Sequence, residues 1–161
     1  MTMPTAERIV VRPALPSDDP QVRSVFDAAF STVRGIYRPM GDVLAHEALR
    51  AQLGTRLVAV LDGDVVGTVQ IDVHSKHVHL IGLAVHPDLQ GRGIGRRLIS
   101  YLVDMAPRLG RSVLALDTIR ETGNVPKFEA MGWHVVSETR SVEFESDTLA
   151  ALHEVKMERA L

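Results

Sequence analysis

The sequence contains no cysteine. This absence excludes disulfide bonds, metal sites built on thiolates and a cysteine nucleophile, so any covalent catalysis would need another side chain. The chain also lacks an apolar run of about 18 residues that could cross a membrane, and it has no charged and then apolar leader. We therefore expect a cytoplasmic protein with no membrane partner.

An excess of positive charge is missing as well. The chain has 18 Lys and Arg against 20 Asp and Glu, which gives a formal net charge of −2. A general nucleic-acid binder needs clustered basic residues to neutralise phosphates, so we expect no nucleic-acid partner. With 161 residues, 45% of them hydrophobic, and no linker or repeat, the sequence predicts a single domain over residues 1–161.

Two well-known phosphate-binding loops are absent. A P-loop requires a Gly-Lys pair, and the sequence has none. A dinucleotide fingerprint requires Gly-x-Gly-x-x-Gly, but Arg96 stands at the third glycine position after Gly91 and Gly93, and Leu98 stands there after Gly93 and Gly95. The protein therefore belongs to neither of these nucleotide-binding classes.

The most informative segment joins a buried strand to an amphipathic helix. Residues 80–85 are apolar apart from Gly82, and His86-Pro87-Asp88 then stops the run, which predicts a central strand. A helix is expected from near Gly93 to residues 109–110. Its apolar stripe comprises Ile94, Leu98, Leu102 and Met105, flanked by Ile99 and Tyr101.

Between that strand and that helix lies a glycine-rich turn. Gly91, Gly93 and Gly95 alternate with other residues, and the missing β-carbons allow the backbone to approach a ligand closely. Free N–H groups at the helix start, the helix dipole and nearby arginines would attract an anion such as a pyrophosphate. The arginines are Arg92, Arg96 and Arg97. The alternative is a tight turn that binds nothing.

The rest of the chain alternates between strand and helix patterns. We expect helices at residues 18–30, 42–53 and 125–131, with a loop at 35–41. Asp62-Gly63-Asp64 is typical of a hairpin turn. Strands are expected at residues 8–12, 57–61, 65–73, 78–85, 112–116 and 134–138, with a last one within 153–157. This order indicates an α/β fold.

Two spaced motifs resemble those of the GCN5-related N-acetyltransferases (GNAT). Gln90-x-x-Gly93-x-Gly95 matches their signature Arg/Gln-x-x-Gly-x-Gly/Ala, which joins a central strand to the helix that holds acyl-coenzyme A. Residues 82–87 resemble the strand segment before that signature. Residues 124–133, which run from Asn124 to Trp133, resemble a second motif in which an Asn opens a short helix.

The resemblance implies a fold and an activity. The fold is a single-domain, mixed and mostly antiparallel sheet flanked by helices, in which two splayed central strands admit the acyl chain. The activity is transfer of an acetyl group from acetyl-CoA, the cosubstrate, to a primary amine by direct attack, without a metal. A non-catalytic acyl-coenzyme A binding or regulatory module is the alternative. The acceptor amine and the oligomeric state, a homodimer included, are left open.

The resemblance also assigns coenzyme contacts. The backbone of Leu83, Ala84 and Val85 would pair with the pantetheine amides, and Asn124 would meet the pantetheine or its thiol end. The pyrophosphate would lie on Gln90, Gly91, Arg92, Gly93, Ile94, Gly95 and Arg96. Phe128 occupies the position of the family's usual Tyr, which protonates the leaving thiolate. Phenylalanine has no such proton, so we expect Phe128 to pack at the thiol end. This departure is the one sequence feature that supports the non-catalytic alternative, while the enzyme remains the favoured interpretation.

The acceptor side offers several candidates. By strand alternation His79 shares a face with Ile81, Leu83 and Val85, near where related enzymes often have a carboxylate, so it is a candidate general base. Asp117 and Glu121 are alternative bases or amine anchors, and water is another route for the amine proton.

Two further groups complete the set of candidates. Tyr37 and Arg38 fall in a loop that lines the acceptor site in this family, where the arginine could clamp a carboxylate. His74, His77 and His79 suggest a metal cluster, but no carboxylate completes that set, so we expect no metal.

Overall fold

The protein is described from a computed structural model, which covers residues 8–39 and 55–161. The helix expected at residues 42–53 lies outside these described residues. In chain order the elements are β1 (Val10–Pro13), η1 (Pro16–Asp18), α2 (Asp19–Ser31), β2 (Arg38–Pro39), β3 (Thr55–Leu61), β4 (Asp64–Val73), β5 (His77–Val85), η2 (Pro87–Leu89), α4 (Ile94–Arg108), β6 (Val113–Ile119), η3 (Arg120–Thr122), α5 (Asn124–Glu129), β7 (His134–Arg140), β8 (Phe144–Glu145) and β9 (His153–Ala160).

The main sheet has seven strands in the order β1-β3-β4-β5-β6-β9-β7. Strands β5 and β6 run parallel, and every other neighbouring pair in this sheet is antiparallel. The apolar strand β5 is therefore central, as its composition predicted, and the sheet is mixed and mostly antiparallel. A connection between parallel neighbours requires a crossover, and α4 supplies it.

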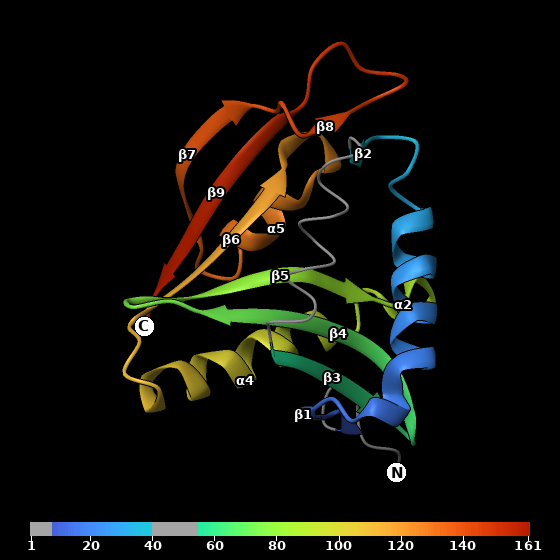
Figure 1. The fold of residues 1–161 in the computed structure, drawn as a ribbon, viewed down its shortest axis with the longest axis vertical. Helices are drawn as coiled ribbons and strands as arrows, with labels where there is room; N and C mark the ends of the chain where they lie inside the picture. The colour runs from blue at the N-terminus through green and yellow to red at the C-terminus, as the bar shows by residue number, and fades with distance from the viewer. Residues whose placement is uncertain (1–7, 40–54) are drawn as a thin grey trace.

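The two parallel strands separate after a short common stretch. Residues 77–80 of β5 pair with residues 113–116 of β6, and the register ends there although both strands continue. Figure 1 shows β5 and β6 diverging from a shared vertex, with β9 and β7 following β6. The splayed central strands expected from the family resemblance are confirmed.

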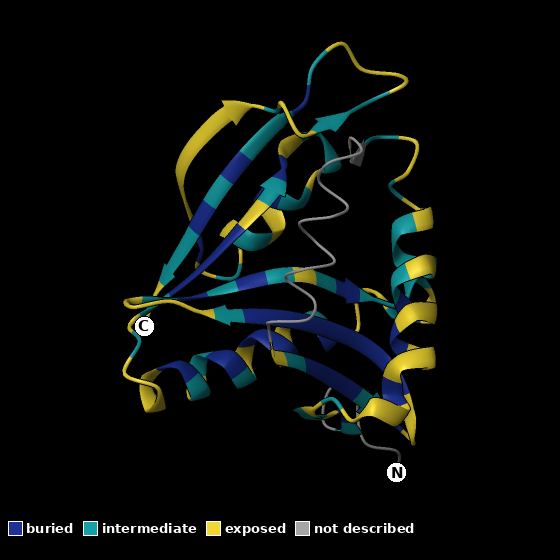
Figure 2. Cartoon of the chain, in the orientation of Figure 1, coloured by how far each residue is buried: buried dark blue, intermediate teal, exposed yellow. Residues whose placement is uncertain are grey.

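Helix α4 packs on one face of the sheet along a single buried stripe. The buried side chains are Ile94, Leu98, Ile99, Leu102 and Ala106. Met105, which the sequence placed in the stripe, is only half-buried, because the buried row advances by four residues at each step and ends at Ala106. Helix α2 covers the opposite face through Val22 and Val25 (Figure 2).

A glycine in β4 lets α4 approach closely. A β-carbon built at Gly67 would lie 2.9 Å from the Ile94 side chain and 3.4 Å from the Ala84 carbonyl oxygen. Such distances require neighbouring atoms to move, so glycine is the residue that fits between β4 and the first turn of α4. This contact fixes where the start of α4 lies relative to the end of β5.

Strand β5 contains a bulge that corrects one expectation. Gly82 has φ +62, and the register against β4 shifts at this point. Before the bulge, Val78 and Leu80 pack in the core beneath α4; after it, Leu83 and Val85 pack against that same core. The extra residue thus reverses the alternation. His79 shares a face with Ile81 but not with Leu83 and Val85.

Other element boundaries differ modestly from the sequence-based expectations. Strand β1 begins two residues later than expected and includes Pro13, which an edge strand tolerates. Strands β6 and β9 each extend three residues further, because they pair with one another along their whole length. The loop expected at residues 35–41 contains β2, which pairs with β8 in a separate two-stranded ribbon that local patterns did not predict.

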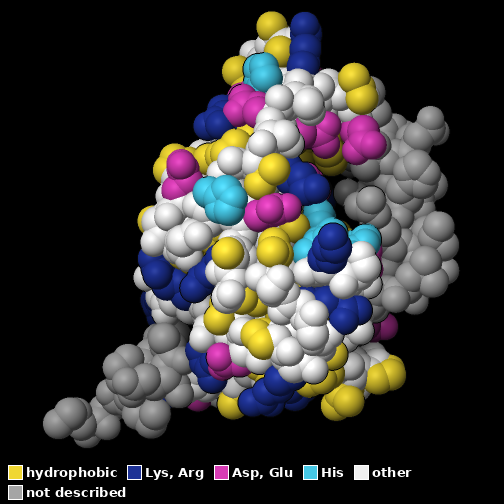
Figure 3. All heavy atoms as spheres, turned by 90° about the vertical axis from the view of Figure 1, so that its left-hand side faces the viewer, with side chains coloured by type: hydrophobic (Ala, Val, Ile, Leu, Met, Phe, Trp, Pro, Cys, Tyr) yellow, Lys and Arg dark blue, Asp and Glu magenta, His cyan; other side chains and the backbone are white. Residues whose placement is uncertain are grey.

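The surface reflects the balanced composition. Positive and negative side chains are interspersed on the face drawn in Figure 3. Strand β7 forms one edge of the sheet and is exposed along its whole length (Figure 2). Within residues 8–39 and 55–161, no helix has the length and apolar character needed to cross a membrane.

Candidate functional site

The turn between β5 and α4 is shaped by left-handed glycines. Gly91 has φ +78, and Gly93, the residue that precedes α4, has φ +85. Only glycine adopts these angles without strain, which explains two of the three alternating glycines. Gly95 is different, because among residues 8–39 and 55–161 a β-carbon there would meet only the Val85 side chain, at 3.9 Å. The described part of the chain therefore does not fill the space beside Gly95.

The start of α4 has unclaimed hydrogen-bond donors. Its first helical bond runs from the Arg97 N–H to the Gly93 carbonyl, at 2.9 Å. The N–H groups that precede it have no partner within the helix, and no side chain caps them among the described residues. With the positive end of the helix dipole and the guanidinium groups of Arg92, Arg96 and Arg97, this terminus suits a pyrophosphate.

The end of β5 presents its backbone to the gap between the splayed strands. The His86 N–H donates to the Val66 carbonyl of β4 at 2.9 Å. Antiparallel alternation therefore turns the peptide groups of Ala84 toward β4 and those of Val85 away from it. The Val85 carbonyl accepts a hydrogen bond from Gln90 Nε2 at 3.2 Å. This hydrogen bond from Gln90, the first residue of the signature, connects the turn to the end of β5. The Val85 N–H faces the gap.

Helix α5 lies on the other side of the gap. Asn124 is its first residue and follows Gly123, which has φ +80. Phe128 is half-buried, and its ring meets Trp133 edge-on with centroids 5.8 Å apart. Trp133 is 3% exposed and belongs to the core. Phe128 therefore packs against the core beside Trp133.

His79 lies where the two splayed strands begin to part. The distance from His79 Nε2 to Asp117 Oδ2 is 3.2 Å. Asp117 directly follows Leu116, the last residue of β6 that pairs with β5. The His79 side chain is 16% exposed and that of Asp117 is 53% exposed, so the pair is accessible to solvent mainly through Asp117. The structure therefore brings together two of the three residues considered as bases.

The histidines at the vertex pack by their rings. His74 stacks on His77 with centroids 4.6 Å apart, and both meet His79 edge-on at 6.2 Å. Burial lowers the pKa of His77, and its neighbouring histidines lower it further. In the part of the chain that the structure describes, no group of three or more His, Asp or Glu is arranged to hold a metal ion.

Glu121, the third candidate base, is held by a neighbour. His153 donates its backbone N–H to Glu121 Oε2 at 3.1 Å, and its Nδ1 lies 2.6 Å from Glu121 Oε1. Burial acts to raise the pKa of Glu121, but the hydrogen bonds from His153 outweigh it and hold the pKa below its usual range. This pair ties the start of β9 to η3.

Sequence reasoning missed Glu154, which strand register brings to the same face as Asp117. Glu154 lies opposite Ile119 of β6, and Asp117 lies opposite Lys156. Ile119 and Asp117 are two residues apart in β6 and therefore share a face, so Glu154 lies on that face as well. Burial raises the pKa of Glu154, and repulsion from Glu143 and Asp117 adds to this, against a hydrogen bond from Ser141. No motif surrounds Glu154, so only the pairing of β9 with β6 could have revealed it.

The two residues predicted for the acceptor side lie at the β2–β8 ribbon. The Tyr37 ring meets Phe144 edge-on with centroids 5.5 Å apart. Arg38 pairs with Glu145 through the backbone. The ribbon joins the end of α2 to the segment between β7 and β9, two regions far apart in the sequence (Figure 1).

A family model identifies the class of protein that this fold and site define. The acetyltransferase (GNAT) family matches residues 21–133, which include the splayed strands, the glycine turn and α5. The chain therefore belongs to the GNAT family and is an acetyltransferase. No curated protein sequence matches it.

Solved structures of this family share the fold over nearly the whole chain. The ribosomal-protein-S18-alanine N-acetyltransferase of Escherichia coli is 17% identical with a TM-score of 0.75, over 94% of this chain and 93% of its own. A GCN5-related N-acetyltransferase from Rhodopseudomonas palustris is 24% identical with a TM-score of 0.72, over 100% and 99%. YncA of Salmonella typhimurium, solved with its cofactor acetyl-CoA, is 22% identical with a TM-score of 0.67, over 96% and 94%.

The raised pKa of Glu154 predicts a pH-dependent stability. An acid whose pKa is raised by folding destabilises the protein while it is ionised, so stability rises as the pH falls through the raised pKa. We expect Glu154→Gln to raise the thermal midpoint at pH 7.5 and to have a smaller effect near pH 4, about the ordinary pKa of a glutamate. Thermal melts at both values test this. Asp104→Asn, at an exposed site on α4, serves as the control, and equal effects of Glu154→Gln at both pH values would contradict the prediction.

Proposed function

We propose that the protein transfers the acetyl group of acetyl-CoA to a primary amine by direct attack. The observation that carries this is the gap between β5 and β6 beyond residues 80 and 116, which lies beside the uncapped start of α4. The start of α4 suits a pyrophosphate, and the gap between β5 and β6 suits an extended chain with amide groups. The absence of cysteine favours direct transfer over an acyl-thioenzyme.

The fit to the coenzyme rests on three groups of residues. Gly91, Gly93 and Gly95 allow close approach of the turn, while the N–H groups of Ile94, Gly95 and Arg96 would bind the pyrophosphate together with Arg92. The open edge of β5 at Leu83 and Val85 would pair with the pantetheine amides as an added strand does. Asn124 and Phe128 would line the thiol end.

The chemistry requires one bond to form and one to break. The amine nitrogen bonds to the acetyl carbon, the carbon–sulfur bond breaks, and its electron pair stays on sulfur. N–H groups of the open β5 edge would stabilise the charge that develops on the carbonyl oxygen. The amine loses a proton and the thiolate gains one, which balances the reaction.

His79 is the proposed acceptor of the amine proton. Asp117, at 3.2 Å, orients the imidazole and stabilises its charged form after proton transfer. The pair lies on the sheet face opposite α4, as the bulge at Gly82 dictates, so the amine would enter from the side of α2 and the coenzyme from the side of α4. The Escherichia coli relative is named for acetylating an alanine of a ribosomal protein, which supports an amine as the acceptor class.

The coenzyme site is tested most directly at Gly95. Since Val85 provides the one close atom among the described residues, Gly95→Val should leave the fold intact while its side chain enters the space for the pyrophosphate. We expect calorimetry to show loss of acetyl-CoA binding with an unchanged circular dichroism spectrum. Ser24→Val, at an exposed position of helix α2, is the control for added bulk. Unchanged affinity in Gly95→Val would remove the pyrophosphate assignment.

Phe128 generates a prediction about the leaving group. If protonation of the thiolate limits the rate, Phe128→Tyr should raise kcat, by up to on the order of a hundredfold. The gain should be largest below the ordinary thiol pKa of about 8.5, where the departing sulfur most needs a proton. Phe30→Tyr, which adds the same hydroxyl on α2, is the matched control. An unchanged or lower kcat in Phe128→Tyr would mean that water or another group already supplies the proton, or that a later step limits the rate.

The assignment of His79 predicts a change in the pH profile. We expect His79→Ala to lower kcat/KM by on the order of a hundredfold and to leave a rate that rises with pH only as the amine itself loses its proton. His134→Ala, on the exposed edge strand, should retain the original rate and profile. Full activity in His79→Ala would show that His79 does not accept the amine proton, and would leave water, Asp117 and Glu121 as the alternatives.

A further inference from the structure

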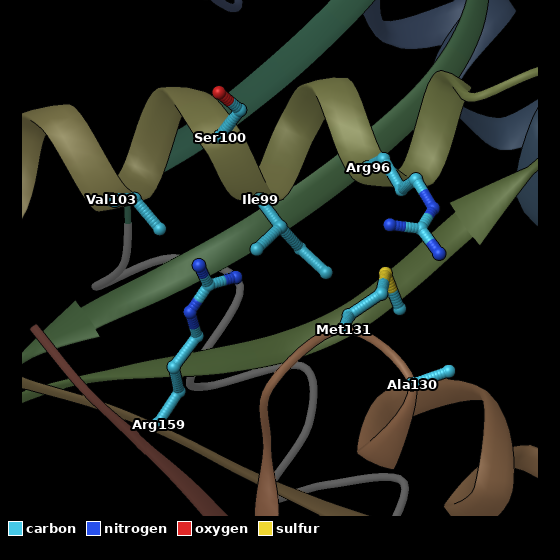
Figure 4. A pocket seen from close by; sticks show the side chains of 7 residues that line it. All are labelled: Arg96, Ile99, Ser100, Val103, Ala130, Met131 and Arg159. Atoms are coloured by element: carbon cyan, nitrogen blue, oxygen red, sulfur yellow. The ribbon is translucent and has the colours of Figure 1, made fainter.

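The face of the sheet that α2 covers carries a half-buried guanidinium group, that of Arg56 at the start of β3. Strand alternation places Arg56 on the same face as Val58, which belongs to the core cluster beneath α2. On the opposite face, Arg96 and Arg159 enter a hollow beside α4 from opposite walls (Figure 4). The acceptor amine is proposed to enter from the side of α2, so Arg56 lies on the acceptor's face.

Neutral groups of β4 hold the guanidinium in one orientation. Arg56 Nη1 donates to Thr68 Oγ1 at 3.1 Å, and Nη2 donates to Gln70 Oε1 at 3.0 Å. The Thr68 hydroxyl in turn donates to the Leu57 carbonyl at 2.8 Å, which leaves its oxygen as the acceptor for Arg56. Thr68 and Gln70 are both buried. The position of the guanidinium is therefore fixed by the sheet before any ligand binds.

The charge of Arg56 has no ion-pair partner among the described residues. Burial lowers the pKa of Arg56, and the negative charge of Asp19 opposes this effect without forming an ion pair. Two of the five N–H groups of the guanidinium donate to Thr68 and Gln70, so three have no acceptor in the part of the chain that the structure describes. A half-buried cation with free donors is stabilised by an anion that brings oxygen atoms to it.

An aromatic ring of α2 links Arg56 to the point where the gap between β5 and β6 begins. Arg56 Cζ lies 5.0 Å from the centroid of the Phe26 ring. The edge of the same ring lies over Gly82, because a β-carbon built there would be 3.2 Å from Phe26 Cε1. Gly82 is two residues beyond Leu80, the last residue of β5 that pairs with β6. Arg56 and the gap are therefore neighbours on this face.

The span from Arg56 to the proposed base suits a small acceptor. Arg56 pairs with Gln70 of β4, which pairs with Ile81 of β5, so the three residues form one row across the sheet. Ile81 shares a face with His79, as described above. Because the guanidinium binds side chains of β4, it extends from β3 toward β5, and the next strand lies about 4.8 Å further on.

We infer that Arg56 binds a carboxylate of the acceptor, so that the substrate is a small amine that also carries a carboxylate group. This inference rests on the proposed function and names its substrate class. The planar guanidinium matches a carboxylate through two parallel hydrogen bonds, and the carboxylate would supply the missing negative charge. With the carboxylate at Arg56, the amine would be directed toward His79. Arg56 would select and position the acceptor without taking part in the transfer itself.

The test compares acceptors that differ only in the carboxylate. Amine-dependent thiol release is measured with glycine, β-alanine, 4-aminobutyrate and the L-amino acids, each against its own carboxamide. Values of kcat/KM refer to the unprotonated amine, because the carboxamide changes the pKa of the amine. For the acceptor with the highest kcat/KM, wild-type protein should prefer the acid to the carboxamide by on the order of tenfold or more, as expected for charge-assisted hydrogen bonds.

Variants of Arg56 locate this preference. Arg56→Gln should lower kcat/KM for the acid to the value for the carboxamide, and Arg56→Lys, which keeps the charge, should retain part of the preference. Arg23→Gln is the matched control, because it removes one positive charge from an exposed position of α2 and should keep the full preference. Each variant is judged by the ratio of two substrates, so a lower fraction of folded protein does not change the result.

The outcomes separate this inference from the proposed function. Thiol release by wild-type protein without a preference for the acid would overturn the inference and leave the proposed function standing. A preference retained in Arg56→Gln would overturn it as well, and its loss in Arg38→Gln would then assign the carboxylate to Arg38. No thiol release with any acceptor would overturn the proposed function itself, and the inference with it.

Discussion

The loss of pairing between β5 and β6 is the constraint on which the rest of the site depends. Parallel strands normally share hydrogen bonds along their length, yet here the ladder stops after four residues of each strand. Backbone groups on an interior strand edge need hydrogen-bond partners. An extended ligand with amide groups would supply them, which supports the proposal that the coenzyme binds in this gap.

Close packing then aligns the remaining parts with this gap. Gly67 allows the first turn of α4 to approach β4, so the unclaimed N–H groups of the helix lie beside the end of β5. Gln90 ties the turn to the Val85 carbonyl and limits its freedom. On the opposite face, the bulge at Gly82 turns His79 away from the coenzyme side. In the proposed mechanism, the acetyl donor and the amine acceptor therefore approach the reacting centre from different faces of the sheet.

Local patterns in the sequence predicted the parts of this site that lie within continuous segments. The apolar strand, the amphipathic helix, the glycine turn and the short helix at Asn124 are each encoded by neighbouring residues, and the structure contains all of them. The face of His79 was predicted wrongly, because one left-handed glycine reverses a strand's alternation without altering its composition. A Gly within a strand indicates a bulge only when the partner register is known.

Features that depend on long-range pairing could not be predicted from the sequence. The β2–β8 ribbon joins segments more than 100 residues apart, and neither short strand has a pattern of its own. Glu154 lies in an ordinary strand, and only the register of β9 against β6 brings it to the same face as Asp117. Its relevance to the site arises from tertiary structure.

The central claim is that the gap holds acetyl-CoA in position for direct attack by an amine. Release of free coenzyme A thiol, measured for the wild-type protein with acetyl-CoA against a panel of primary amines, tests it most directly. The account predicts thiol release that depends on the amine, with one acetylated amine formed for each thiol released. Tight binding of acetyl-CoA without amine-dependent release for any member of a broad panel would contradict it.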